Sequence, residues 1–128
     1  MTSLMIDTNF YGEIMMGTER AKKNIEQTEK VLICPIVLGE LLVGFKYGNR
    51  KETNTDKLHL FLQLPTVTVT NITRQSAEFY ALIVIQLKKA GTPIPTNDIW
   101  IAACCLEHGA TLATDDNHFQ KISNLPVV

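Results

Sequence analysis

The sequence lacks any uninterrupted apolar stretch near the roughly 18 residues that a membrane-spanning helix requires. Residues 31–45 are apolar or small except for Glu40, which interrupts the stretch. The N-terminal residues MTSLMIDTNF have no basic cluster of the kind that opens a secretory signal, and they contain an acid at Asp7. We therefore expect a cytoplasmic protein with no membrane segment.

The sequence also has few cysteines and a net charge close to zero. The three cysteines are odd in number, and two of them are adjacent, which predicts small buried side chains in a reducing compartment and excludes a disulfide framework. Twelve basic and 13 acidic residues leave a net charge of −1, so no overall basic surface indicates nucleic-acid binding. No Cys/His spacing typical of a zinc site is present.

The remaining composition, 45% hydrophobic and 20% charged, is typical of a globular protein, and we expect residues 1–128 to form a single domain. Short apolar runs alternate with helix-length segments. Predicted strands cover residues 4–6, 31–34, 67–69, 111–114 and 126–128. Predicted helices cover residues 8–16, 22–29, 35–47, 52–62, 73–90 and 97–108.

This alternation predicts an α/β fold with a mostly parallel sheet of about five strands, covered by helices on both faces. In the helix before Gly91, the spacing of Ala77, Tyr80, Ala81 and Val84 predicts a buried stripe. The run LIVI, residues 82–85, widens this stripe, and we expect part of it to meet another subunit. Ligands of such sheets bind beyond the carboxyl ends of the strands.

Five acids are placed near those ends. Asp7 follows the first strand, Asp115 and Asp116 follow the fourth, Asp98 opens a helix, and Glu40 lies about one turn into the helix after the second strand. Carboxylates that converge raise one another's pKa values, and a hard divalent cation removes that repulsion. An all-oxygen ligand set suits Mg²⁺ or Mn²⁺.

Each acid also has a structural explanation. Asp7 and Asp98 are suitable helix N-caps, while Asp115 and Asp116 are suitable turn residues. Glu40 is too far into its helix to cap it, and burying a carboxylate among apolar neighbours is costly, which leaves an exposed position on an amphipathic helix as its alternative. The acids taken together favour a metal site more strongly than any one of them.

The segments MIDTN, LGELLVG, NDIWIAA and LATDDNHF, in this order, resemble the PIN domain and most closely the VapC toxins of toxin–antitoxin pairs. The resemblance spans almost the whole chain and implies a PIN-like α/β/α sandwich. It places the family's acidic quartet at Asp7, Glu40, Asp98 and Asp116. Asp115 competes with Asp116 for the fourth place, and the supporting polar residues implied are Thr8, Asn9 and Thr114.

The resemblance also implies a function, that of an endoribonuclease dependent on Mg²⁺ or Mn²⁺ that hydrolyses RNA phosphodiester bonds. Asp7, Asp98 and Asp116 would hold the principal metal, and Glu40 would hold a second metal or position the attacking water. The implied partners are an RNA substrate, a cognate VapB-like antitoxin and a second copy of the chain in a homodimer.

An acidic pocket needs basic side chains near its rim to attract a polyanion. The candidates for RNA contacts are Lys46, Arg50, Lys51, Lys88 and Lys89. Solvated helix faces explain these basic clusters equally well. His118 lies close to the proposed site, where a contact with phosphate is one alternative, and we expect it to have a turn or surface role.

Two other functions compete with the nuclease. One is a non-catalytic PIN-fold module that binds RNA or protein, which the intact quartet disfavours. The other is a small phosphohydrolase with an aspartyl nucleophile, suggested by a strand that ends in Asp7 followed by Thr8. That chemistry needs an acid two residues beyond the nucleophile, where this chain has Asn9, and a downstream lysine motif, which is not evident.

Overall fold

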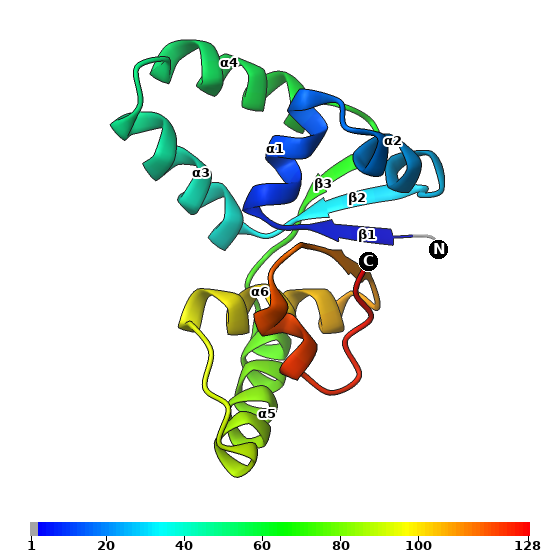
Figure 1. The fold of residues 1–128 in the computed structure, drawn as a ribbon, viewed down its shortest axis with the longest axis vertical. Coiled ribbons are helices and arrows are strands. Elements are labelled where there is room, and N and C mark those ends of the chain that lie inside the picture. Colours follow the sequence, from blue (N-terminus) through cyan, green and yellow to red (C-terminus); the bar gives the residue numbers. More distant parts are fainter. Residues whose placement is uncertain (1–2) are drawn as a thin grey trace.

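The fold alternates strands and helices along the chain in the computed structural model, which describes residues 3–128 (Figure 1). In chain order the elements are β1 (Ser3–Ile6), α1 (Thr8–Met16), α2 (Glu19–Glu26), β2 (Lys30–Ile33), α3 (Pro35–Tyr47), α4 (Lys51–Leu62), β3 (Val67–Val69), α5 (Arg74–Ala90), α6 (Thr96–Glu107), β4 (Thr111–Ala113) and the 3₁₀ helix η1 (Asn117–Lys121). This order confirms the predicted α/β class.

The four strands form one parallel sheet in the order β3-β2-β1-β4. Leu4, Met5 and Ile6 on the central strand β1 are fully buried, as expected for a parallel sheet covered on both faces. Figure 1 shows α1 to α4 on one side of the sheet and α5 and α6 on the other. The α/β/α layering implied by the resemblance is therefore present.

The sheet has four strands where the sequence predicted about five. The expected fifth segment, PVV, makes only a single parallel bridge, between Val127 and Leu112. The carbonyl of Pro126 accepts a hydrogen bond of 2.9 Å from the amide of Leu112, but proline has no N–H with which to extend a ladder.

The second helix begins earlier than the predicted residues 22–29. Thr18 caps α2, since its side chain accepts a hydrogen bond from the amide of Ala21 and its backbone is extended. The helix therefore starts at Glu19 and ends by Glu26. The predicted start at residue 22 is wrong because Thr18, a common type of N-cap, sets the start of the helix.

The long helix α5 has the predicted ends, and its buried face matches the predicted stripe in part, since Tyr80 and Val84 pack against the core. Thr73 and Ser76 form a reciprocal capping box at its start, and Gly91 ends it in the left-handed conformation, with φ of 69°. The side chains it buries are Ser76, Ile83 and Leu87, whereas Ala77 and Ala81 of the predicted stripe are exposed. Small alanines fit either face of a helix, so they did not define the buried side.

The strand order places a ligand crevice at a specific point of the sheet edge. From β1 the chain continues to β2 and β3 on one side and then returns to β4 on the other, so the order reverses beside β1. Ile6 is level with Ile33 and with Ala113, and consequently Asp7 and Thr114 emerge side by side at the carboxyl edge.

Candidate active site

Asp7 links the end of β1 to the start of α1. Its side chain caps α1 by accepting a hydrogen bond of 2.8 Å from the amide of Phe10, so the predicted capping role is present. The residue is only 6% exposed. Burial raises the pKa of Asp7, and hydrogen bonds from Thr114 and Phe10 oppose this shift. A cap alone does not require such burial, since most caps lie at the surface.

Glu40 is half-buried on α3, and its two carboxylate oxygens have different partners. The hydroxyl of Thr8 donates to Oε1 at 2.6 Å, and the amide of Asn97 donates to Oε2 at 3.2 Å. Its carboxylate is therefore held between α1 and the start of α6, and it does not project from a solvated face of α3. This contact explains why an acid is tolerated within the apolar run 31–45.

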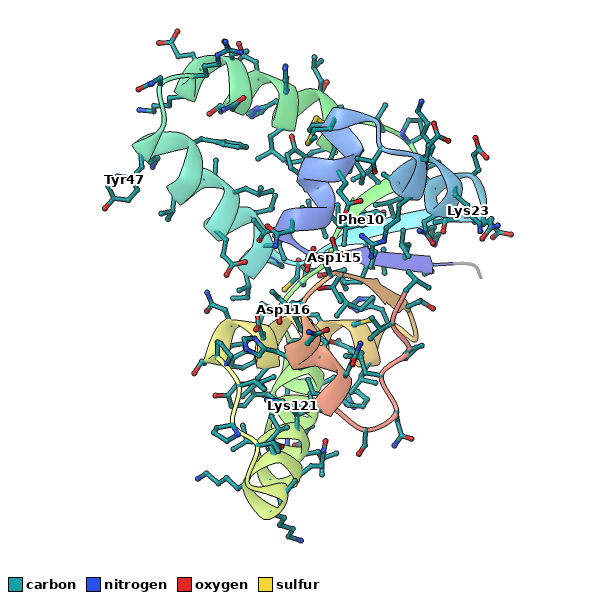
Figure 2. The ribbon with its side chains drawn as sticks, in the orientation of Figure 1. Phe10, Lys23, Tyr47, Asp115, Asp116 and Lys121 are labelled. Carbon is teal, nitrogen blue, oxygen red and sulfur yellow. The ribbon has the colours of Figure 1, made fainter. Side chains whose placement is uncertain are left out.

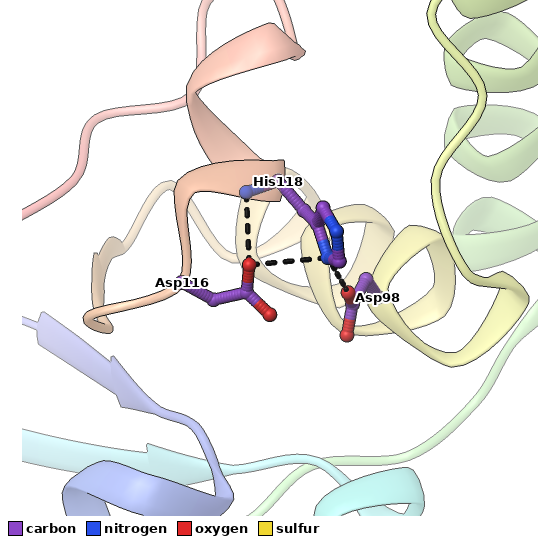
Figure 3. A group of neighbouring side chains, drawn as sticks. All are labelled: Asp98, Asp116 and His118. Atoms are coloured by element: carbon purple, nitrogen blue, oxygen red, sulfur yellow. Dashed lines mark hydrogen bonds and ion pairs between the residues drawn. The ribbon is translucent and has the colours of Figure 1, made fainter.

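Asp98, Asp116 and His118 form a compact group (Figure 3). The Nδ1 atom of His118 lies 3.0 Å from Oδ2 of Asp98 and 3.1 Å from Oδ1 of Asp116. One ligand atom from each residue lies within 4.8 Å of the others. Burial raises the pKa of Asp98, the hydrogen bond from His118 lowers it, and the charges of Asp116 and Glu40 raise it further.

The two neighbouring aspartates after β4 have separate environments (Figure 2). The backbone amide of Asp116 donates to the hydroxyl of Thr114 at 2.9 Å, and the side chain of Asp116 caps η1 by accepting from the amide of His118. The carboxylate of Asp115 instead forms an ion pair of 3.1 Å with Arg20, and its side chain is 65% exposed. Of the two, only Asp116 lines the central cavity.

That cavity, of about 300 Å³, opens at the carboxyl edge of the sheet. It is lined by Asp7, Thr8, Asn9, Glu40, Asp98, Ile101, Asp116 and Phe119. Four carboxyl groups that are distant in sequence therefore converge on one space, as the strand order predicted. The aspartyl-nucleophile alternative gains no support, because no lysine lines this cavity.

The donor set fits a hard divalent cation. Four carboxyl groups supply oxygen ligands, and the imidazole of His118 adds a nitrogen that Mn²⁺ accepts. Burial raises the pKa values of Asp7 and Asp98, because it disfavours their negatively charged forms. A bound cation would stabilise those charged forms. The site is therefore suited to a metal by chemistry as well as by position.

The sequence model of the PIN domain family matches residues 4–125. The chain belongs to the PIN domain family. Ribonuclease VapC1 of Rickettsia felis is 31% identical over 130 residues, covering 98% of this chain and 94% of that protein. Ribonuclease VapC2 of the same organism is 30% identical over 126 residues, covering 94% and 92% of the two chains.

Solved structures agree with this membership. The crystal structure of VapBC2 from Rickettsia felis, bound to a DNA fragment from its promoter, matches with a TM-score of 0.87 and 27% identity, covering 99% of this chain and 98% of that chain. The PIN fold, the α/β class and the resemblance to the PIN domain family are confirmed by these likenesses.

Three polar residues of this PIN domain site were missed or assigned other roles at the sequence level. The sequence predicts a turn or surface position for His118, whereas in the structure its Nδ1 atom bridges Asp98 and Asp116. Asn97 and Arg20 were not considered, although they contact Glu40 and Asp115. Asn97 directly precedes Asp98, so the sequence does indicate that it lies near the site. Nothing in the sequence connects Arg20 to residue 115.

The basic candidates, and the aromatic residues Phe10, Tyr11 and Trp100, are not among the residues that line the acidic cavity. Phe10 and Tyr11 are core residues, and Trp100 stacks on Tyr80 with ring centroids 4.2 Å apart. The five basic residues proposed for RNA contacts are exposed, at the α3–α4 junction and at the end of α5. Every helix within residues 3–128 is too short or too polar to cross a bilayer.

Proposed function

We propose that this chain is the toxin of a VapBC-type pair, an endoribonuclease that uses Mg²⁺ or Mn²⁺ to hydrolyse RNA phosphodiester bonds. The observation that carries the proposal is the convergence of Asp7, Glu40, Asp98 and Asp116 on one cavity in a PIN domain chain. The relatives named ribonuclease VapC supply the class of substrate. Residues 1–128 act as one nuclease unit in this proposal.

The acids have two kinds of role in this proposal. Asp7, Asp98 and Asp116 hold the principal metal through their carboxylate oxygens. The chemistry that Mg²⁺ or Mn²⁺ would supply there is to polarise a phosphoryl oxygen and to make water more acidic. Glu40 orients the attacking water or contributes to a second cation, and the hydrogen bonds from Thr8 and Asn97 keep its carboxylate in place for either task.

The supporting residues act through hydrogen bonds. Thr8 orients Glu40, and the hydroxyl of Thr114 accepts from the amide of Asp116 and lowers the pKa of Asp7. Asn9 lines the cavity and is exposed, which suits a contact with substrate. Removing such partners of ligating carboxylates typically costs about 10–100-fold in metal affinity or activity.

The exposed basic residues supply the attraction for RNA. Figure 1 places the α3–α4 junction, which carries Lys46, Arg50 and Lys51, at one end of the molecule and the end of α5, which carries Lys88 and Lys89, at another. The acidic cavity lies between them, so an RNA strand that crosses it can meet positive charge on either side.

The proposed partners have exposed apolar surface to bind. Leu82 and Ile85 on α5 are 64% and 51% exposed, and we assign this face to the homodimer. On α3, Leu42 and Val43 are exposed and suit the VapB-like antitoxin, whereas Leu41 belongs to the core. The proposed setting for these contacts is the cytoplasm.

Expression of the chain without its antitoxin tests the proposal. We expect growth arrest and RNA cleavage that requires Mg²⁺ or Mn²⁺ and stops with a chelator. Asp7→Asn should abolish both effects, and Asp56→Asn, an exposed aspartate on α4, is the matched control that should retain them.

Two outcomes would contradict the proposal. Cleavage that survives both chelation and Asp7→Asn would exclude the metal-dependent mechanism. A folded wild-type chain that binds RNA but never cuts it in the presence of either metal would favour the non-catalytic binding module.

A further inference from the structure

Arg20, on the first turn of α2, joins three separate parts of the structure. Its guanidinium donates to the carbonyl oxygens of Thr114 and Val128, each at 2.9 Å. It also forms ion pairs with Glu13 on α1 and, at 3.1 Å, with Asp115. The side chain is 31% exposed and lies over the ring of Phe10, with its central carbon 5.1 Å from the ring centroid.

These contacts reach the two residues that directly precede Asp116. The hydroxyl of Thr114 accepts from the amide of Asp116, and its interaction with the Asp7 carboxyl group lowers the pKa of Asp7. Arg20 fixes the carbonyl of Thr114 and the carboxylate of Asp115 at the same time. The turn between β4 and η1 is therefore held at two consecutive residues, and the direction of the Asp116 carboxylate follows from that turn.

The shape of the guanidinium is essential to this arrangement. Arginine presents five N–H donors in a rigid plane that also stacks on an aromatic ring, while lysine offers one compact charge. An isolated surface ion pair contributes little, but here two carbonyls, two carboxylates and a ring share one side chain. A lysine at this position would keep the charge and lose most of the contacts.

We propose that Arg20 is a positioning residue of the acidic site, whose guanidinium holds the turn that orients Asp116 and supports Asp7 through Thr114. The proposal rests on the proposed function for its effect on metal binding and RNA cleavage. Arg20 itself is not among the residues that line the cavity. Its geometry, more than its charge, is what the site requires.

The test compares Arg20→Lys and Arg20→Gln with Lys23→Gln. Lys23 is an exposed basic residue on the same helix, and Figure 2 shows it at the outer edge of α2, away from Asp116. Mn²⁺ affinity is measured by the electron paramagnetic resonance of free Mn²⁺, and kcat and KM are measured for RNA cleavage. Melting temperatures and amide hydrogen exchange at Asp116 are recorded for each variant.

We expect both Arg20 variants to bind Mn²⁺ about 10–100-fold more weakly and to lose a similar factor in kcat, with KM for RNA little changed. The Asp116 amide should exchange faster, and Lys23→Gln should match the wild type. Full recovery of metal affinity in Arg20→Lys would overturn the role of guanidinium geometry. Unchanged affinity in both variants would overturn the positioning role. If Arg20→Gln does not fold, Arg20→Lys decides the question.

Failure of the proposed function gives a different result. In that case the wild-type chain neither binds Mn²⁺ in the cavity nor cleaves RNA. The exchange rate of the Asp116 amide still tests Arg20, because it reports the turn without any metal. Faster exchange at Asp116, with β1 unaffected, supports positioning, and an unchanged rate contradicts it.

Discussion

The hydroxyl of Thr8 donates a 2.6 Å hydrogen bond to Oε1 of Glu40, across 32 positions of sequence. Asn97 donates to the other oxygen from the first turn of α6. Glu40 is thus fixed by two elements outside its own helix, and its carboxylate faces the cavity shared with Asp7. A hydrogen-bonded carboxylate is far less costly to bury than an unpaired one.

Glu40→Gln should remove activity with little effect on stability. Glutamine keeps one oxygen to accept from Thr8 or Asn97, and it lowers the negative charge in the crowded cavity. We expect RNA cleavage to fall by about 10²-fold or more, on the scale typical of positioned acid–base groups. The melting temperature should stay close to that of the wild type.

The matched control for this substitution is Glu78→Gln, at an exposed position on α5. It should leave both cleavage and melting temperature unchanged. A large fall in melting temperature for Glu40→Gln, without a specific loss of cleavage, would identify Glu40 as a structural residue.

Asp7→Asn should raise the melting temperature at neutral pH while it abolishes cleavage. Burial raises the pKa of Asp7 in the folded chain, so the folded state binds the proton more readily than the unfolded state. The stability that this proton contributes is fully present below the ordinary aspartate pKa, and it is lost as pH rises through the raised value. Asparagine also keeps the N-cap to α1.

Thermal unfolding across pH, without added metal, measures this effect. The increase in melting temperature of Asp7→Asn over the wild type should be largest near neutral pH. It should shrink as pH falls toward about 4, the ordinary pKa range of aspartate. Asp56→Asn on the surface of α4 should show no such advantage. An Asp7→Asn protein less stable than the wild type at neutral pH would contradict the prediction.

Asp116→Asn and Asp115→Asn should have unequal effects on cleavage. Asp116 lines the cavity and lies within 3.1 Å of His118, whereas Asp115 is exposed and paired with Arg20. We expect Asp116→Asn to reduce RNA cleavage by about 10²-fold or more. Asp115→Asn leaves Arg20 its contacts with Thr114 and should change cleavage by less than about threefold, as for an exposed ion pair. The opposite order would assign the fourth acid to Asp115.

His118→Asn should weaken Mn²⁺ binding more than Mg²⁺ binding. The imidazole is the one nitrogen donor in the group of Asp98, Asp116 and His118, and nitrogen ligands favour Mn²⁺ over Mg²⁺. We expect a loss of about 10–100-fold for Mn²⁺, measured by titration calorimetry. Equal losses for both metals would show that His118 only orients the two aspartates, and no loss would remove it from the site.

Sequence patterns were sufficient to predict the features that depend on residues close together in the chain. The apolar runs before Asp7 and Asp115 predicted strands, and a proline in the first turn placed the start of α3 at residue 35. The parallel βαβ pattern then predicted that acids after β1 and β4 would meet. Strand identity and helix caps depend on neighbours within a few residues, which a sequence displays directly.

Contacts between distant elements could not be predicted in this way. The sequence left open whether Asp115 or Asp116 faces the cavity, and the path of the turn after Thr114 decided it. His118 and Arg20 acquire their roles only because η1 and α2 fold against the sheet edge.

By itself, the order of residues determined the four strands of the sheet, most helix ends and the acids that gather at one edge, but it also predicted a fifth strand that does not form. Tertiary structure alone decided which carboxylate oxygens face the cavity and which basic side chains pair with the carboxylates outside it. The reason is physical: electrostatic interaction depends on separations of a few ångströms, and these are set by packing between segments up to about a hundred positions apart.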